Sequence, residues 1–215
     1  MVAAVFCALA YASVYVFHIK VAFLTFDAKD AVIGLASLLL GPVYGIVSAA
    51  LVAVLEFITI SDTGVYGLIM NFLSTGTFAL CCGIIYKYKR TFPGAILAVI
   101  MSLISVTAVM MLANLFITPF FMGADRSEVI KIIPTLLLPF NLAKASMSAA
   151  LTLIIYKPLS AGLKRAKLLP LAKEQNYRFG VRSVIVTVCG LIIIALALTV
   201  FLVFLNGNFE LVAQR

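Results

Sequence analysis

Seven apolar stretches follow one another along the chain, separated by short segments that contain charged residues, glycine or proline. Most approach the ~20 residues that an α-helix needs to cross a bilayer, and they lack the short alternating segments of an outer-membrane barrel. Because a membrane span must satisfy its backbone hydrogen bonds internally, we predict helices. The predicted spans are residues 1–17, 31–41, 43–58, 65–86, 94–118, 135–156 and 183–205.

The second and third stretches are short and meet at Gly41-Pro42. Proline inside a helix removes a hydrogen bond and clashes with the preceding turn, so a helix is expected to break at this dipeptide. We therefore predict a tight helical hairpin. The alternative, one span over residues 31–58, would reverse the orientation of every later helix.

Composition agrees with a membrane location: 64% of the residues are hydrophobic, 11% are charged, and the mean hydropathy is +1.20. A soluble domain of this size has no use for so much apolar surface, so an integral membrane protein is predicted. The net charge of +8 would suit nucleic acid, but ten of the 16 Lys and Arg residues lie within 87–90 and 157–182. Such clusters are typical of cytosolic loops, and no nucleic-acid partner is expected.

Seven spans place both basic clusters on the same side of the membrane, which is the cytosolic side by this rule. The N-terminus is then cytosolic and the C-terminus external, in a multi-pass protein of the cell membrane. The loops at 18–30, 59–64 and 119–134 lie outside, and their charges nearly balance.

The apolar run that ends at Tyr156 contains a carboxamide and an ammonium group, those of Asn141 and Lys144. A lysine inside a membrane helix costs about 2.5–3.5 kcal/mol on insertion scales and is seldom there without a partner or a task. At this spacing both side chains lie on one helix face. Asn114 lies at the same depth in the preceding span, so the three predict a binding site that opens outward. Snorkelling of Lys144 to the interface is the alternative.

Other polar residues leave alternatives open. Glu56, near the outer end of the third predicted span, is either a counter-ion for Lys144 or an interfacial residue. Asn71 belongs to a small and polar helix face that favours helix packing. Acid–base catalysis by Lys144 or Glu56 would need a further group, and no catalytic, ATP-binding or metal-binding motif accompanies them. Neither an enzyme nor a metal site is expected.

Residues 23–30 (Phe-Leu-Thr-Phe-Asp-Ala-Lys-Asp) alternate apolar and polar positions, which indicates an extended segment with Asp30 as the N-cap of the next helix. This segment is either an ordinary interfacial loop or a lid over a pocket. In the first span Ala4, Ala8 and Ala12 share one face, and small residues let membrane helices approach closely. They predict a docking face for another membrane protein, with chance as the alternative because alanine is common in such helices.

Together these elements resemble the substrate-binding S components of energy-coupling factor (ECF) vitamin transporters, in particular the riboflavin-specific branch. The resemblance covers roughly residues 1–165, and its most specific element is Pro-Phe-Asn-Leu-Ala-Lys at 139–144. The other carriers are residues 23–30, Gly41-Pro42, 62–65 (Asp-Thr-Gly-Val), 70–73 (Met-Asn-Phe-Leu), Asn114 and Thr118-Pro119.

The resemblance implies an all-α integral membrane protein whose six-helix bundle captures riboflavin from outside the cell. A transmembrane T component, expected at the alanine face, and two cytosolic ATPases would then drive delivery. Riboflavin or FMN is cargo, and no resident cofactor is expected. The implied substrate-binding residues are Asn114, Asn141 and Lys144 at the polar edge of the flavin, the covering loop residues Leu24, Thr25, Phe26 and Asp27, and Asn71.

Three segments are predicted: a flavin-binding domain at 1–165, a basic cytosolic linker at 166–182, and a seventh C-terminal transmembrane helix at 183–205, which the family usually lacks. The linker would suit the T component or anionic lipid. Lys29 in the covering loop is a candidate for favouring phosphorylated flavin. The alternatives are an S component for FMN or a different vitamin, an intramembrane enzyme, and a structural, non-flavin membrane subunit.

Overall fold

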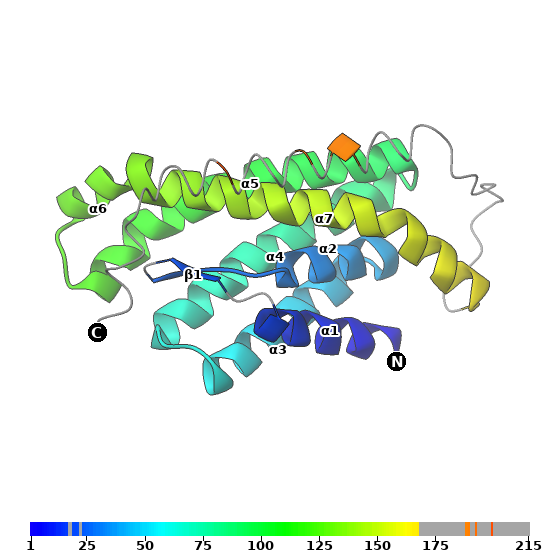
Figure 1. Ribbon diagram of the computed structural model, residues 1–215, viewed down its shortest axis with the longest axis horizontal. Helices are drawn as coiled ribbons and strands as arrows, with labels where there is room; N and C mark the ends of the chain where they lie inside the picture. Colours follow the sequence, from blue (N-terminus) through cyan, green and yellow to red (C-terminus); the bar gives the residue numbers. More distant parts are fainter. Residues whose placement is uncertain (17–18, 22, 168–187, 190–191, 193–198, 200–215) are drawn as a thin grey trace.

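The computed structural model describes residues 1–167 except 17–18 and 22, together with the separate positions 188–189, 192 and 199. Most of the described chain is helical, and Figure 1 shows the long helices lying side by side as a bundle. The predicted linker and seventh helix lie almost entirely outside the described residues. The elements are α1 (Val2–Val16), β1 (Ile19–Val21), β2 (Leu24–Phe26), α2 (Lys29–Leu40), α3 (Pro42–Thr59), α4 (Gly64–Tyr88), α5 (Phe92–Met122), α6 (Arg126–Ile132), the π-helix η1 (Ile133–Leu137) and α7 (Leu138–Arg165).

Four helical segments of the described chain are long and apolar enough to cross a membrane: α3, α4, α5 and the continuous α6–η1–α7 segment Arg126–Arg165. α1 is a shorter apolar helix. α2, with 12 residues, is about 18 Å long, less than the thickness of a bilayer core. Most of its side chains are buried among α1, α3, α4 and α7, so α2 is an interior half-length helix and not the membrane span predicted at residues 31–41. With α6–η1–α7 counted once, the described residues 2–165 form the six helices that the resemblance implies.

The helical hairpin predicted at Gly41-Pro42 is confirmed. Gly41 has a φ of 113°, a conformation that favours glycine, and Pro42 is the first residue of α3. α4 packs closely against this turn because Gly83 has no side chain: a Cβ at Gly83 would lie 2.6 Å from the Pro42 Cα. The hairpin therefore packs directly onto the backbone of α4.

The apolar core fills the half of the bundle where α2 ends at Leu40, α4 ends at Tyr88 and α5 begins at Phe92. Phe78, Val99 and their neighbours are fully buried there. The opposite half contains the buried charged residues and the short antiparallel hairpin β1–β2, in which Ile19 pairs with Phe26 and Val21 with Leu24. The extended segment predicted within 23–30 is thus strand β2, and the bundle carries its polar chemistry at this end.

Candidate substrate-binding site

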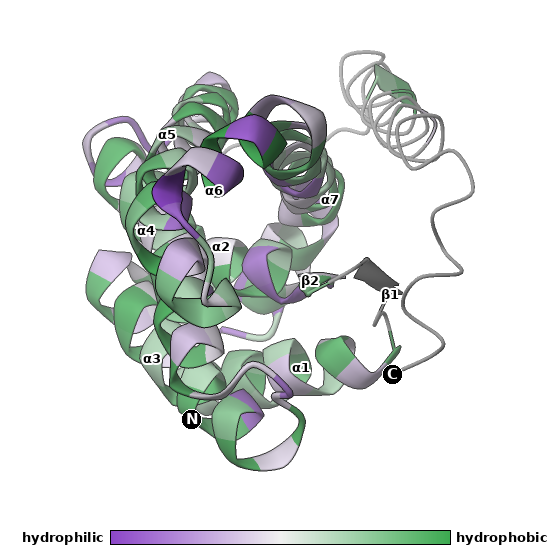
Figure 2. Cartoon of the chain, turned by 90° about the vertical axis from the view of Figure 1, so that its left-hand side faces the viewer, coloured by the Kyte–Doolittle hydropathy of each residue, from purple (hydrophilic) through white to green (hydrophobic). Residues whose placement is uncertain are grey.

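A cavity of about 170 Å³ lies at the end of the bundle near α6. Its walls come from the β-hairpin, the loop between α3 and α4, and the adjoining parts of α3, α4, α5 and α7. Figure 2 looks onto this end of the bundle, where β2 lies between α7 and α1. The basic ends of α4 and α7, at Lys87 and Arg165, lie at the other end of the bundle.

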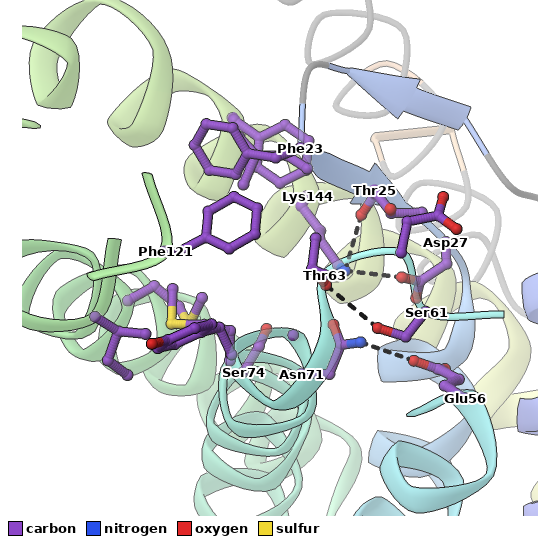
Figure 3. A pocket seen from close by; sticks show the side chains of 18 of the residues that line it. Phe23, Thr25, Asp27, Glu56, Ser61, Thr63, Asn71, Ser74, Phe121 and Lys144 are labelled. Carbon is purple, nitrogen blue, oxygen red and sulfur yellow. Dashed lines mark hydrogen bonds and ion pairs between the residues drawn. The ribbon is translucent and has the colours of Figure 1, made fainter. Parts of the chain in front are cut away.

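Aromatic side chains form one side of the cavity. The ring of Phe121, from α5, lies 5.6 Å from the ring of Phe23 and 6.1 Å from that of Tyr66, measured between centroids. Phe140 adds a fourth ring from α7, and Figure 3 shows Phe23 and Phe121 facing each other across this side. Walls of this kind suit a flat aromatic ligand, because offset and edge-on ring contacts are favourable.

Lys144 extends from α7 to the hairpin that borders the cavity. Its Nζ donates to the Thr25 carbonyl oxygen at 3.1 Å and to Asp27 Oδ2 at 2.8 Å, as Figure 3 shows. Asp30 Oδ2 is farther away, at 4.0 Å. An ammonium group has three N–H donors, so one remains for a ligand in the cavity. Lys144 can therefore hold the hairpin and contact a ligand at the same time.

Asp27, in the loop between β2 and α2, is almost completely buried. Its Oδ1 accepts from the backbone N–H of Lys29 at 3.1 Å, and the Lys29 Nζ lies 3.7 Å from Oδ2. Burial alone would raise the pKa of the Asp27 carboxyl, but the ammonium groups of Lys144 and Lys29 outweigh it and hold that pKa below its ordinary value. Asp27 is therefore the charged centre that joins the two lysines.

Lys29 connects this centre to α3. Its Nζ lies 2.6 Å from Glu56 Oε2, which also accepts from Asn71 Nδ2 at 2.9 Å. Both Lys29 and Glu56 are buried. Of the two readings open for Glu56, neither holds: its partner is Lys29, and the counter-ion of Lys144 is Asp27. Lys29 is likewise not a free cation in the covering loop, because two carboxylates already neutralise it.

Asp30 does not cap α2, contrary to the sequence prediction. The helix begins at Lys29 after Ala28, which has no side-chain cap, and the Lys29 N–H donates to Asp27 Oδ1 instead. Asp30 is buried instead and accepts from Thr75 Oγ1 at 2.5 Å and from Ser74 Oγ at 3.5 Å. The polar face of α4 thus satisfies a buried carboxylate in addition to packing against α2.

The structure brings Asn141 and Lys144 together in the cavity wall but places Asn114 behind it. Asn141 Nδ2 donates to the Leu137 carbonyl oxygen at 2.8 Å, which leaves its Oδ1 as an acceptor. Asn114 is fully buried and accepts through Oδ1 from Thr118, which does line the cavity. Of the predicted hairpin residues, Leu24, Thr25 and Asp27 line the cavity, as does Asn71. Phe26 lies outside the lining and packs on Phe140.

The predicted docking residues Ala4, Ala8 and Ala12 are all exposed. The face of α1 that packs into the bundle carries Phe6, Ala10 and Val14 instead. Within the described chain, the alanine face is therefore left uncovered along its length.

The sequence alone did not identify Lys29 as a buried residue of the cavity wall or Asp30 as a buried residue next to it. A signal existed, since three ionisable residues (Asp27, Lys29 and Asp30) cluster beside an apolar run. An exposed loop would show the same pattern, and their partners at 56, 75 and 144 are far away in sequence. Only the packing of α2 against α3, α4 and α7 reveals the network.

Comparison with known proteins places the chain among transport proteins. Residues 1–156 match the family described as "ECF transporter, substrate-specific component". The chain belongs to this family. This S component is 32% identical over 149 residues to the riboflavin transporter RibU of Staphylococcus aureus (strain TCH60). The matched region covers 66% of this chain and 78% of the relative.

The fold of the S component agrees with a solved structure described as "Structure and mechanism of the S component of a bacterial ECF transporter". The TM-score is 0.64 at 29% identity, and the match covers 76% of this chain and 95% of the other. The protein is thus an all-α, multi-pass membrane protein with a role in vitamin transport, and the cavity is its candidate substrate site.

Proposed function

We propose that this S component captures riboflavin from outside the cell and supplies it to an ATP-driven ECF transporter. The observation that carries the proposal is the cavity itself. It combines aromatic walls with a buried lysine that keeps one N–H donor for a ligand, under a hairpin that the same lysine holds. The identity to a riboflavin transporter supports the same ligand.

In the proposed complex the flavin ring lies between the aromatic side chains, and its pyrimidine edge faces α7. Lys144 donates to a ring carbonyl, while the free Oδ1 of Asn141 accepts from the ring N–H. Thr118, oriented by Asn114, gives a further polar contact. A molecule without acceptors at this edge leaves buried donors unpaired, which is how such sites discriminate.

The hairpin is the proposed lid. Its contacts with α7 are polar at Thr25 and Asp27 and apolar at Phe26, so closure both orders the ion pairs and excludes water. The basic ends of α4 and α7 favour the cytosol by the positive-inside rule. The cavity, at the other end, then faces outside, and the N-terminus of α1 is cytosolic.

Energy coupling is proposed to reside on partner proteins. The exposed alanine face of α1 is the proposed contact with the T component, since small residues permit close helix approach. Two cytosolic ATPase subunits would hydrolyse ATP, and the S component itself would catalyse no reaction and hold no resident cofactor. The basic segment 166–182 would contact the T component or anionic lipid.

Uptake by cells tests the proposal. A riboflavin-auxotrophic strain that expresses the S component with a T component and ATPases should accumulate riboflavin, and omission of the ATPases should abolish accumulation. Lys131→Met, an exposed substitution on α6, is the matched control for Lys144→Met and should leave uptake unchanged. Accumulation of thiamine or biotin instead of riboflavin would favour a different vitamin and reject the flavin assignment.

A further inference from the structure

Glu56 keeps one carboxylate oxygen without a hydrogen-bond partner among the residues that the structure describes. Its Oε2 accepts from both Lys29 and Asn71, whereas its Oε1 is buried and accepts from none of them. The residue is only 4% exposed and lines the cavity. Buried acceptors in native proteins are almost always satisfied, so this oxygen indicates a donor that arrives with the ligand.

The surroundings of Glu56 differ chemically from the aromatic side of the cavity. Asn71, Ser61 and Thr63 lie on the same side as Glu56, and the hydroxyl groups of Ser61 and Thr63 are 3.3 Å apart. Figure 3 shows this polar group across the cavity from Phe23 and Phe121. One ligand that spans both sides therefore needs an aromatic part and a hydroxylated part.

The charges around the cavity disfavour an anion at the polar side. Three carboxylates line the cavity (Asp27, Glu56 and Asp62) against two ammonium groups, Lys29 and Lys144. Both ammonium groups are already paired with carboxylates at 2.6–2.8 Å. A phosphate carries about −1.5 to −2 charges at neutral pH and offers chiefly acceptors. Its acceptor oxygens would face another acceptor, the Glu56 Oε1, and both cations that line the cavity in the described chain are already paired.

We propose that Glu56 determines specificity for an uncharged polyol chain: its Oε1 accepts a hydrogen bond from a ribityl hydroxyl and excludes the phosphorylated chain. This inference rests on the proposed flavin function and deepens it, since it names riboflavin over FMN. It also replaces the expectation that Lys29 favours phosphorylated flavin, because Glu56 and Asp27 neutralise that lysine.

The test is a binding comparison with three flavins: riboflavin, FMN, and lumichrome, the ring system without the ribityl chain. The full chain is purified in detergent as wild type, as Glu56→Gln and as the exposed control Glu128→Gln. Wild type should bind riboflavin on the order of 100-fold more tightly than FMN. Glu56→Gln should reduce this preference by about tenfold or more. The variant loses the charged hydrogen bond to the ribityl hydroxyl of riboflavin and, at the same time, the repulsion of the FMN phosphate. Lumichrome affinity should not change, and Glu128→Gln should behave as wild type.

Each other outcome has a definite meaning. Three outcomes overturn the inference about Glu56 but not the proposed function. They are an unchanged preference for riboflavin in Glu56→Gln, an equal loss of affinity for lumichrome and riboflavin in that variant, and FMN binding as tight as riboflavin binding in wild type. Absence of flavin binding by folded wild type overturns the proposed function and this inference with it. If Glu56→Gln does not fold because Lys29 loses its partner, the neutral double variant Lys29→Gln/Glu56→Gln replaces it and should also lose preference for riboflavin.

Discussion

Replacement of Lys144 by Met removes two roles that we propose for one ammonium group, holding the hairpin and contacting the ligand. The Lys144–Asp27 pair is 2.8 Å long, and its side chains are 9% and 1% exposed. Removal of one member of a buried pair typically costs about 3–5 kcal/mol. Lys29 remains 3.7 Å from Asp27, so we expect the lower value, about 3 kcal/mol, for the loss of folding free energy.

A double-mutant cycle measures this coupling. Asp27→Asn, Lys144→Met and the double variant are unfolded by denaturant in detergent micelles, with Asp125→Asn and Lys131→Met as exposed controls. The double variant should be more stable than the sum of the single losses predicts, by about 2 kcal/mol or more, because no buried charge is left alone. Riboflavin affinity should stay low in the double variant, since the donor to the ring edge is absent.

Two results would contradict these roles of Lys144. Additive losses of stability across the cycle would show that the pair does not hold the hairpin. Recovery of riboflavin affinity in the double variant would show that Lys144 acts on binding only through the lid, and it would remove the lysine from the ligand contacts.

Three further predictions concern other parts of the molecule. Ala8→Leu should impair assembly with the T component, measured by co-purification, while riboflavin binding by the isolated protein stays intact; equal loss of both would reject the docking face. Gly83→Ala should destabilise the bundle by about 1–3 kcal/mol because its Cβ meets the Pro42 backbone, whereas Gly162→Ala, with open space around it, should not. Because the pKa of the Asp27 carboxyl is lower in the folded than in the unfolded chain, its stabilisation is complete above about pH 5 and is lost as the pH falls through the folded-state pKa. The Tm difference between wild type and Asp27→Asn should therefore be constant from about pH 5 to 8 and shrink in stronger acid.

Hydropathy located the helices well but not their ends. The predicted fifth span stops at residue 118, before Pro119, yet α5 continues through that proline to Met122. Proline is tolerated in packed membrane helices, so it was a poor terminator here. The predicted sixth span, 135–156, is the apolar centre of a continuous helical segment from Arg126 to Arg165. Its charged ends extend the helix beyond the apolar window that hydropathy detects.

Site residues were predictable where their placement depends only on neighbouring positions in the sequence. Asn141 and Lys144 line the cavity together because their spacing places them on one helix face, which the sequence shows directly. The partners of Lys144 were not predictable, since Asp27 lies 117 positions away and an acidic residue in a polar loop is usually solvated. For the same reason Glu56 could not be assigned before its contact with Lys29 was known.

The most direct test of flavin capture is a fluorescence titration of the detergent-purified full chain with riboflavin, with thiamine and biotin as competitors. We expect saturable quenching of flavin fluorescence with one site per chain, unaffected by either competitor and strongly weakened in Lys144→Met but not in Lys131→Met. Absence of saturable quenching by a folded preparation, or displacement of riboflavin by thiamine or biotin, would contradict flavin capture.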